Sequence, residues 1–301
     1  MQDLDENTVT DAVLAQMATT PDARLREIMA AAVRHLHAFA REVNLTPAEW
    51  IAGIKFLTDV GHACTPIRQE FILLSDVLGL SACVNALHDK TALEHGTQSS
   101  LLGPFFRQDA PEFSLGQSIV QAPHGTEIVM YGQVTDAAGQ PLAGATVDVW
   151  QTDEKGAYDL QLGNGEAADM RGRFRCDDAG KYHFRTVRPL GYSIPLDGPV
   201  GELVRRQRRH GHRPAHIHFL IGAPGHRELV TALYLADDEH VDSDTVFGVS
   251  RSLVVSPRAN DPDAPIPGLP TIRYDFTLGR AADNDTGRVG ADPAQIVAAA
   301  D

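Results

Sequence analysis

Two histidines have the spacing of metal ligands on a β-strand. They lie in Arg213-Pro-Ala-His216-Ile-His218-Phe-Leu-Ile221, a run rich in branched apolar residues that is typical of a strand. Successive strand side chains point to opposite faces, so His216 and His218 share one face. Same-face neighbours lie roughly 7 Å apart, which lets two imidazoles reach one metal ion. Taken alone, the motif is more often a half-buried strand that carries two partly exposed histidines.

A metal held by two histidines needs further ligands, and Asp, Glu, a third His or Tyr could supply them. Two tyrosines lie where strands end. Tyr158 follows a strand predicted over 145–153, and Tyr192 follows one that ends at Arg188. Such chain ends are where binding sites are built on a β-sandwich. Either tyrosine could instead be an amphipathic loop residue with its hydroxyl in water.

The bulk composition is that of a globular protein. The chain has 301 residues, 43% hydrophobic and 22% charged, enough for one large domain or two smaller ones. A net charge of −14 argues against non-specific binding to nucleic acids or anionic membranes, because both are polyanions.

Cysteine usage and the first residues predict a reducing compartment. Cys64, Cys83 and Cys176 are odd in number and widely spaced, which is unlike a disulfide framework or a thiolate zinc site. The acidic start, residues 1–6, is followed by no apolar segment of a signal peptide. No apolar run approaches the ~20 residues of a membrane span. We therefore expect a cytoplasmic protein with no membrane partner.

Residues 8 to about 95 predict four or five amphipathic helices. The clearest start is Thr46-Pro47-Ala48-Glu49, which has a capping Thr, Pro at the first helical position and Glu three residues after the cap. We take residues 1–100 as a helical N-terminal dimerisation domain. Its apolar stripes fit a core or a helix–helix dimer surface.

From about residue 100 the pattern changes to short alternating strands separated by turns, with no helix expected between them. This predicts a β-sandwich or barrel over 101–280, followed by a C-terminal extension over 281–301. The expected fold class is mainly β with an α-helical N-terminal segment. The predicted strands cover 127–136, 145–153, 172–176, 181–188, 215–223, 229–236, 252–255 and 271–278.

Taken together, these motifs resemble the intradiol ring-cleavage dioxygenases. The matching segments are Gly-Ala-Tyr158-Asp, Gly-Tyr192-Ser-Ile-Pro-Leu-Asp-Gly-Pro and Arg213-Pro-Ala-His216-Ile-His218-Phe. The resemblance extends over about residues 8–256, including the helical segment. It implies one non-haem Fe(III) per subunit, held by Tyr158, Tyr192, His216 and His218. Hard anionic phenolate donors favour ferric over ferrous iron.

The same resemblance implies roles around the metal. Tyr192 matches the ligand that substrate displaces, which makes it a candidate base, and Arg213 matches an arginine that stabilises negative charge beside the substrate ring. One position departs from the pattern. Catechol-type members have Gln where this chain has Ala232, so any hydrogen bond from that position is absent.

Within the family, 69–76 and 194–201 look most like hydroxyquinol 1,2-dioxygenases. That likeness implies cleavage of hydroxyquinol (1,2,4-trihydroxybenzene) by O2 to 3-hydroxy-cis,cis-muconate, or maleylacetate. Asp76 could accept a hydrogen bond from the third ring hydroxyl, or could pair locally within the helices. The alternative is a catechol or chlorocatechol 1,2-dioxygenase that yields cis,cis-muconate. The implied pocket comprises Leu73, Asp76, Leu102, Gly103, Pro104, Phe105, Ile194, Pro195 and Arg213.

Two other classes stay open from the residues alone. One is a cupin-like Fe(II) or Zn enzyme that uses His216 and His218 with Glu239 and His240. The other is a non-catalytic β-sandwich binding module with a helical dimer clamp. The family resemblance further implies a homodimer joined through the N-terminal helices, with lipid in an apolar tunnel as an additional partner.

Overall fold

The computed structural model describes residues 4–65, 68–92, 96–121, 125–162 and 168–281. The chain forms two compact units, Met1–His62 and Ala63–Asp301. The last two helices of the N-terminal segment therefore belong to the same unit as the strands. The limits at 100 and 280 that the sequence suggests stay a prediction.

The first unit is helical, as predicted. Asp22 caps the second helix, where its carboxylate accepts the backbone N–H groups of Arg24 and Leu25 at 2.8 and 3.0 Å. The third helix begins with the expected capping box. The Thr46 backbone N–H donates to Glu49 Oε2 at 2.9 Å, and the Glu49 backbone N–H donates to Thr46 Oγ1 at 3.3 Å. The helices are α1 (Val9–Met17), α2 (Ala23–Glu42) and α3 (Pro47–Ala63).

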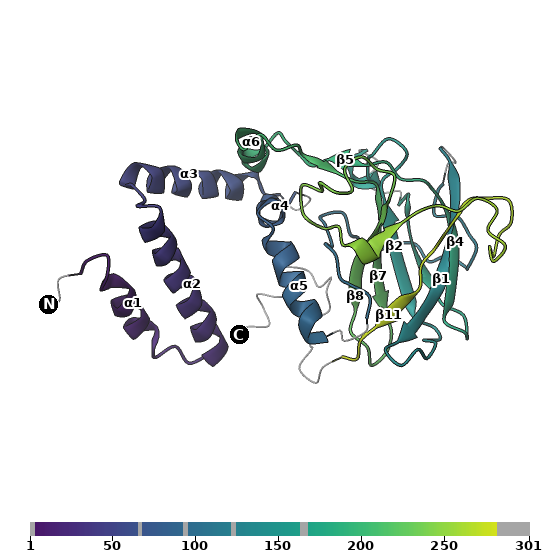
Figure 1. Cartoon of the computed structure of the whole chain (residues 1–301), viewed down its shortest axis with the longest axis horizontal. Coiled ribbons are helices and arrows are strands. Elements are labelled where there is room, and N and C mark those ends of the chain that lie inside the picture. Colours follow the sequence, from purple (N-terminus) through teal and green to yellow (C-terminus); the bar gives the residue numbers. More distant parts are fainter. Residues whose placement is uncertain (1–3, 66–67, 93–95, 122–124, 163–167, 282–301) are drawn as a thin grey trace. The chain divides into compact units, whose positions relative to one another are not determined.

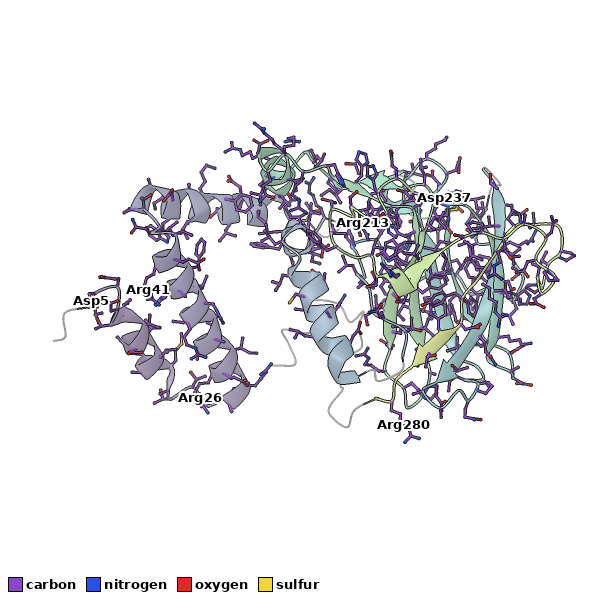
Figure 2. The ribbon with its side chains drawn as sticks, viewed as in Figure 1. Asp5, Arg26, Arg41, Arg213, Asp237 and Arg280 are labelled. Atoms are coloured by element: carbon purple, nitrogen blue, oxygen red, sulfur yellow. The ribbon has the colours of Figure 1, made fainter. Side chains whose placement is uncertain are left out.

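Helices α1 and α2 lie against each other, and Figure 1 draws them side by side. Arg41 of α2 reaches across to the start of α1 (Figure 2), where it donates to the Glu6 carbonyl at 2.9 Å and to Thr10 at 3.2 Å. Several large apolar side chains of α2 remain exposed, among them Leu36 at 65% and Phe39 at 52%. A helix with such a stripe needs another apolar surface to cover it.

The second unit contains α4 (Glu70–Val77) and α5 (Leu80–Ala92), which bring the described helices before the strands to five, within the predicted four or five. They turn at Gly79, whose φ of 74° favours glycine. No single described helix is long and apolar enough to cross a membrane, although α4 and Leu80–Leu87 together reach that hydropathy across a 73° bend.

Two sheets follow, and the predicted strand-rich region is confirmed (Figure 1). One has the order β10-β1-β11 with β4 on the other edge of β1; the other has the order β3-β2-β7-β8-β9. The strands are β1 (Glu127–Asp136), β2 (Thr146–Gln151), β3 (Arg171–Arg175), β4 (Lys181–Val187), β7 (His216–Gly222), β8 (Leu229–Leu235), β9 (Val254–Val255), β10 (Thr271–Arg273) and β11 (Phe276–Leu278).

The two sheets share one hydrophobic core, which makes the unit a β-sandwich. Met130 of β1 and Phe184 of β4 belong to the same buried cluster as Val149, Ile217 and Phe219 from the other sheet, and the rings of Phe184 and Phe219 lie 6.5 Å apart. The other face of β7 carries His216 and His218, as the alternation of side chains predicts.

The expectation of no helix among the strands is wrong. Helix α6 spans Pro199–Arg206 and buries Val200 and Val204. Gly198-Pro199 marks its start, because proline suits the first position of a helix. Glu70 of α4 is buried and accepts the Val200 N–H at 3.1 Å, which anchors this helix.

Tyr192 also lies in more regular structure than the predicted loop. It belongs to β5 (Tyr192–Ser193), which pairs antiparallel with β6 (His212–Arg213). In this pairing Tyr192 lies directly opposite Arg213. Two residues expected to meet at one site are therefore fixed side by side by backbone hydrogen bonds.

Candidate metal centre

The two histidines of β7 face each other. Their Nε2 atoms lie 3.1 Å apart, and both side chains are buried. His216 Nδ1 lies 2.6 Å from the Pro214 carbonyl, so Nδ1 carries the proton and Nε2 presents its lone pair. An orienting bond of this kind is what metal-binding imidazoles usually have.

Both predicted tyrosines meet this pair. Tyr158 follows β2 at the start of a short 3-10 helix (Asp159–Gln161), and its hydroxyl lies 3.4 Å from His216 Nε2. The Tyr192 ring lies 5.5 Å from that of Tyr158 and 5.7 Å from that of His216, between ring centres. The structure thus gathers two phenol oxygens and two imidazole nitrogens from three separate segments.

Burial sets the protonation states of these groups. It raises the pKa of Tyr158 well above its ordinary value, with Tyr192 adding to the effect. It lowers the pKa of His216 and of His218 well below the usual range, and Arg213 lowers both further. The imidazoles are therefore neutral, the form that binds metals. A phenol so buried ionises at neutral pH only if a strong Lewis acid takes its oxygen, so this donor set fits a hard metal cation.

Arg213 lies beside the same atoms, at the centre of the strand-rich unit (Figure 2). Its Nη1 is 3.4 Å from the Tyr192 hydroxyl and 3.2 Å from His216 Nε2. Burial alone would lower the pKa of this guanidinium, but Asp244 and the nearby phenols raise it well above its ordinary value. The predicted cation is thus present and charged at the site.

Aromatic rings pack against the side chains of the candidate metal ligands. Trp150 of β2 lies opposite His218 in the register of β2 and β7, and the two rings stack in parallel at 4.8 Å. Phe105 stacks on Tyr158 at 4.2 Å. Such packing fixes ring orientation and excludes water, which strengthens electrostatic interactions inside the site.

Seven of the nine predicted substrate residues line two adjoining cavities, and Arg213 and Ile194 line neither. One, of about 370 Å³, is bounded by Leu73, Asp76, Pro104, Phe105 and Pro195. The other, of about 410 Å³, is bounded by Asp76, Leu102 and Gly103.

Gly103 lies against the metal site itself. A Cβ there would lie 3.7 Å from His218 Nε2. Ile194 is buried but lines neither cavity.

Asp76 is the buried carboxylate that lines both cavities; Glu70, which lines the first one, is also buried but is paired with Arg68 at 2.9 Å. Burial raises its pKa, and Ser81 and Arg213 partly oppose that shift. A buried carboxylate without a cationic partner of its own, next to apolar cavity walls, is an arrangement expected where a polar group of a ligand is to be recognised.

The cupin-like alternative is wrong. Glu239 is exposed, and His240 stacks on His212 at 4.6 Å and lies 4.9 Å from His210, in a separate surface cluster. Within the described part of the chain, no group of three or more His, Cys, Asp or Glu side chains is arranged to hold a metal.

Three residues around Arg213 were not predicted from the sequence. Tyr234, Asp244 and Ser100 form hydrogen bonds at or next to its guanidinium. Tyr234 had a usable signal: it lies two residues after Ala232 on β8, hence on the same face. Asp244 and Ser100 lie in irregular segments, where only the folded chain reveals their partners.

Comparisons with known proteins agree with this fold. Residues 102–280 match the family model described as dioxygenase, and residues 22–96 match that of the catechol dioxygenase N terminus. The chain is 48% identical to a 6-chlorohydroxyquinol 1,2-dioxygenase of Cupriavidus pinatubonensis, over 84% of this chain and 92% of the relative. It is 42% identical to a hydroxyquinol 1,2-dioxygenase of a Rhizobium species, over 83% and 84%.

Solved structures give the same picture. A hydroxyquinol 1,2-dioxygenase from Pseudomonas putida superposes with a TM-score of 0.84 at 41% identity, over 92% of this chain and 99% of that one. A catechol 1,2-dioxygenase from an Acinetobacter species gives a TM-score of 0.79 at 28% identity, over 96% of each chain.

The β-sandwich, its helical N-terminal segment and the matching family models define a ring-cleavage dioxygenase. The chain belongs to the intradiol ring-cleavage dioxygenases. It is an enzyme that acts on an aromatic substrate with O2. The predicted family and enzyme class are confirmed, and a non-catalytic binding module is excluded.

If Tyr158 and His218 bind the metal, Tyr158→Phe and His218→Ala will each reduce the metal retained by the purified protein to well below that of wild type. Elemental analysis by mass spectrometry measures this directly. The matched control is Tyr182→Phe, which removes another buried hydroxyl, one that donates to the Tyr274 carbonyl at 2.8 Å in the core. Equal metal content in all four proteins would contradict the assignment.

The raised pKa of Asp76 makes a prediction about stability. Folding opposes ionisation of this carboxyl, so its charge lowers the free energy of unfolding at pH above both the folded and the unfolded pKa. Asp76→Asn removes that charge and should stabilise the protein at neutral pH. The gain should shrink as pH falls through the folded pKa and vanish below the unfolded one. Urea denaturation at several pH values tests it; a pH-independent difference would refute the burial argument.

Proposed function

We propose that this enzyme cleaves hydroxyquinol between its two adjacent hydroxyl-bearing carbons, inserts both atoms of O2 and forms 3-hydroxy-cis,cis-muconate, or maleylacetate. The observation that carries this choice of substrate is the buried carboxylate of Asp76 in both cavities beside the metal site. Relatives at 48 and 42% identity act on chlorinated and plain hydroxyquinol by name, which supports it. Catechol or chlorocatechol, giving cis,cis-muconate, is the alternative.

We assign the metal as one non-haem Fe(III) per subunit, held by Tyr158, Tyr192, His216 and His218. Two phenol oxygens favour ferric iron, and the neutral imidazoles complete the set. Ferric iron there would supply a Lewis acid that binds the diol through its oxygens and makes the ring electron-rich enough to react with O2.

The residues of the chain then have distinct tasks. Tyr192, within 3.4 Å of Arg213, is the candidate base for the second hydroxyl proton of the diol. The Arg213 cation would stabilise negative charge that develops on the ring during oxygen insertion. Apolar walls around the ring would be formed by Leu73, Pro104, Phe105 and Pro195, with Leu102, Gly103 and Ile194 beside them.

Asp76 would discriminate by hydrogen bonding. It can accept a hydrogen bond from the third hydroxyl of hydroxyquinol, whereas catechol would leave this buried carboxylate without that donor. Ser81 already donates one hydrogen bond to Asp76, so catechol would leave the remaining acceptor positions of this carboxylate without a donor, at a desolvation cost of order 1–3 kcal/mol. The requirement for a hydrogen bond to Asp76 therefore lowers kcat/KM for catechol more than it raises kcat/KM for hydroxyquinol.

We also propose a homodimer joined through the helices of the first unit. The exposed apolar residues of α2 and α3 would be covered in this way; Trp50, for example, is 54% exposed. Lipid between the subunits is a further occupant, to be sought by mass spectrometry of an organic extract. The cytoplasmic location stays a prediction.

The purified ferric enzyme should have a higher kcat/KM for hydroxyquinol than for catechol. Asp76→Ala should narrow that ratio by roughly tenfold or more, because the penalty on catechol disappears. Leu73→Ala is a matched control from the same helix, since its apolar contact serves both rings alike. A wild-type preference for catechol would reject the substrate assignment, and an unchanged ratio in Asp76→Ala would reject the role of Asp76.

The homodimer predicts that a charge within the apolar stripe of α2 separates the subunits. Phe39→Glu should convert a dimer to a monomer in size-exclusion chromatography with light scattering. Leu190→Glu, at a residue 51% exposed in the strand-rich unit, is the control and should remain dimeric. A wild-type monomer, or dissociation of both variants alike, would contradict an interface at α2.

A further inference from the structure

Two side chains hold the Arg213 guanidinium in place on the side away from the metal ligands. We propose that Tyr234 and Asp244 are positioning residues, which aim Arg213 at the substrate, a task to which position 232 on the same strand as Tyr234 cannot contribute. Ala232 is buried opposite His218 in the register of β7 and β8 and has no side-chain donor. The proposal rests on the proposed function, since it concerns how Arg213 serves that reaction.

Asp244 fixes one edge of the guanidinium. Its Oδ1 lies 3.3 Å from Arg213 Nε and its Oδ2 lies 3.4 Å from Nη2, so the carboxylate faces two donors of the same fork. The carboxylate also accepts the backbone N–H groups of Val246 at 3.3 Å and Gly248 at 3.0 Å. A buried carboxylate held by two amides has a set orientation, which it passes to the planar cation it pairs with.

Tyr234 fixes the other side. It lies opposite His216 in the β7–β8 register, and its hydroxyl is 3.3 Å from Arg213 Nη2 and 2.8 Å from Ser100 Oγ. Ser100 Oγ donates to the Gly248 carbonyl at 3.0 Å, so it must accept from Tyr234. Tyr234 in turn accepts from Arg213. The hydroxyls of Tyr234 and Ser100 therefore each donate one hydrogen bond and accept one. All the hydrogen bonds from Arg213 to the Gly248 carbonyl point in the same direction, and such cooperative chains strengthen each bond.

The loop at Gly248 closes tightly over this network. A Cβ on Gly248 would lie 2.6 Å from the Tyr234 hydroxyl and 3.1 Å from both Arg213 Nη2 and Asp244 Oδ2. The backbone therefore approaches the guanidinium as closely as a residue without a side chain allows.

The consequence is a defined direction for the remaining nitrogen. With Nε and Nη2 engaged by Asp244 and Tyr234, Nη1 is left facing the site, 3.4 Å from the Tyr192 hydroxyl and 3.2 Å from His216 Nε2. Stabilisation of charge that develops in a transition state depends on donors being oriented in advance. Loss of either support should therefore reduce kcat more than it changes KM.

The test is a double-mutant cycle between Tyr234 and Arg213. Tyr234→Phe, which deletes only the hydroxyl, should lower kcat/KM for hydroxyquinol by roughly ten- to a hundredfold, mostly through kcat. In an Arg213→Lys background the same change should cost little, because the group it positions is already gone. A crystal structure of metal-free Tyr234→Phe should show Arg213 Nη1 displaced from Tyr192, a readout independent of activity.

Controls separate positioning from stability. Tyr182→Phe removes a buried hydroxyl elsewhere in the core. It should keep the wild-type kcat, while its melting temperature changes by about as much as that of Tyr234→Phe. Asp244→Asn should show the same loss of kcat as Tyr234→Phe. If the Asp244→Asn protein does not fold, Tyr234→Phe alone tests the proposal.

The possible failures are distinct. Full additivity in the cycle, or an undisturbed Arg213 with unchanged kcat, overturns the positioning role. A wild-type enzyme that does not cleave hydroxyquinol overturns the proposed function, and the crystal structure still decides whether Tyr234 holds Arg213.

Discussion

The alternation of side chains along β7 is the constraint on which the site depends. β7 lies between β2 and β8 in the sheet order and is buried on both faces. Ile217 and Phe219 enter the core between the sheets, which fixes the register, and His216 and His218 are thereby committed to the opposite face. A slip of one residue would exchange the two pairs, so the packing of the core and the geometry of the metal site are specified together.

The site brings together polar and charged side chains whose burial would cost much free energy without a hydrogen-bonding or charged partner. Buried phenols, neutral imidazoles, a guanidinium and a carboxylate lie within a few contacts of one another. A buried ion pair such as Arg213–Asp244 is weak evidence for stability, because desolvation offsets most of its attraction. Its value here is orientation. Burial of Asp76 likewise opposes its ionisation, and the hydrogen bond from Ser81 offsets only part of that cost.

The sequence predicted most of the elements and the core of the site for local reasons. Helices followed from apolar periodicity and from caps such as Thr46–Glu49, and the shared face of His216 and His218 followed from strand geometry alone. The two tyrosines gained meaning only through a resemblance to a known family. Their meeting depends on pairing between distant segments, as when β5 places Tyr192 opposite Arg213.

What the sequence did not predict shares one physical cause. Helix α6 is anchored by Glu70, which lies about 130 residues earlier in the chain. Asp244 reaches Arg213 from an irregular loop, and Ser100 joins Tyr234 across 134 positions. Such contacts follow from tertiary packing and not from the local pattern. The separation of His240 from the metal site belongs to the same class, because nothing in its spacing shows that it faces His210 and His212 instead.

The optical spectrum of the iron-loaded protein, recorded before and after anaerobic addition of hydroxyquinol, tests the central claim most directly. Ligation of Fe(III) by Tyr158 and Tyr192 predicts a red-brown protein with a broad tyrosinate-to-iron absorption in the visible range. Binding of the triol through its oxygens, with release of Tyr192, predicts a clear change in that band in the absence of O2. A colourless iron-loaded protein would contradict tyrosinate ligation, and a coloured one whose spectrum ignores hydroxyquinol would contradict direct binding of this substrate at the metal.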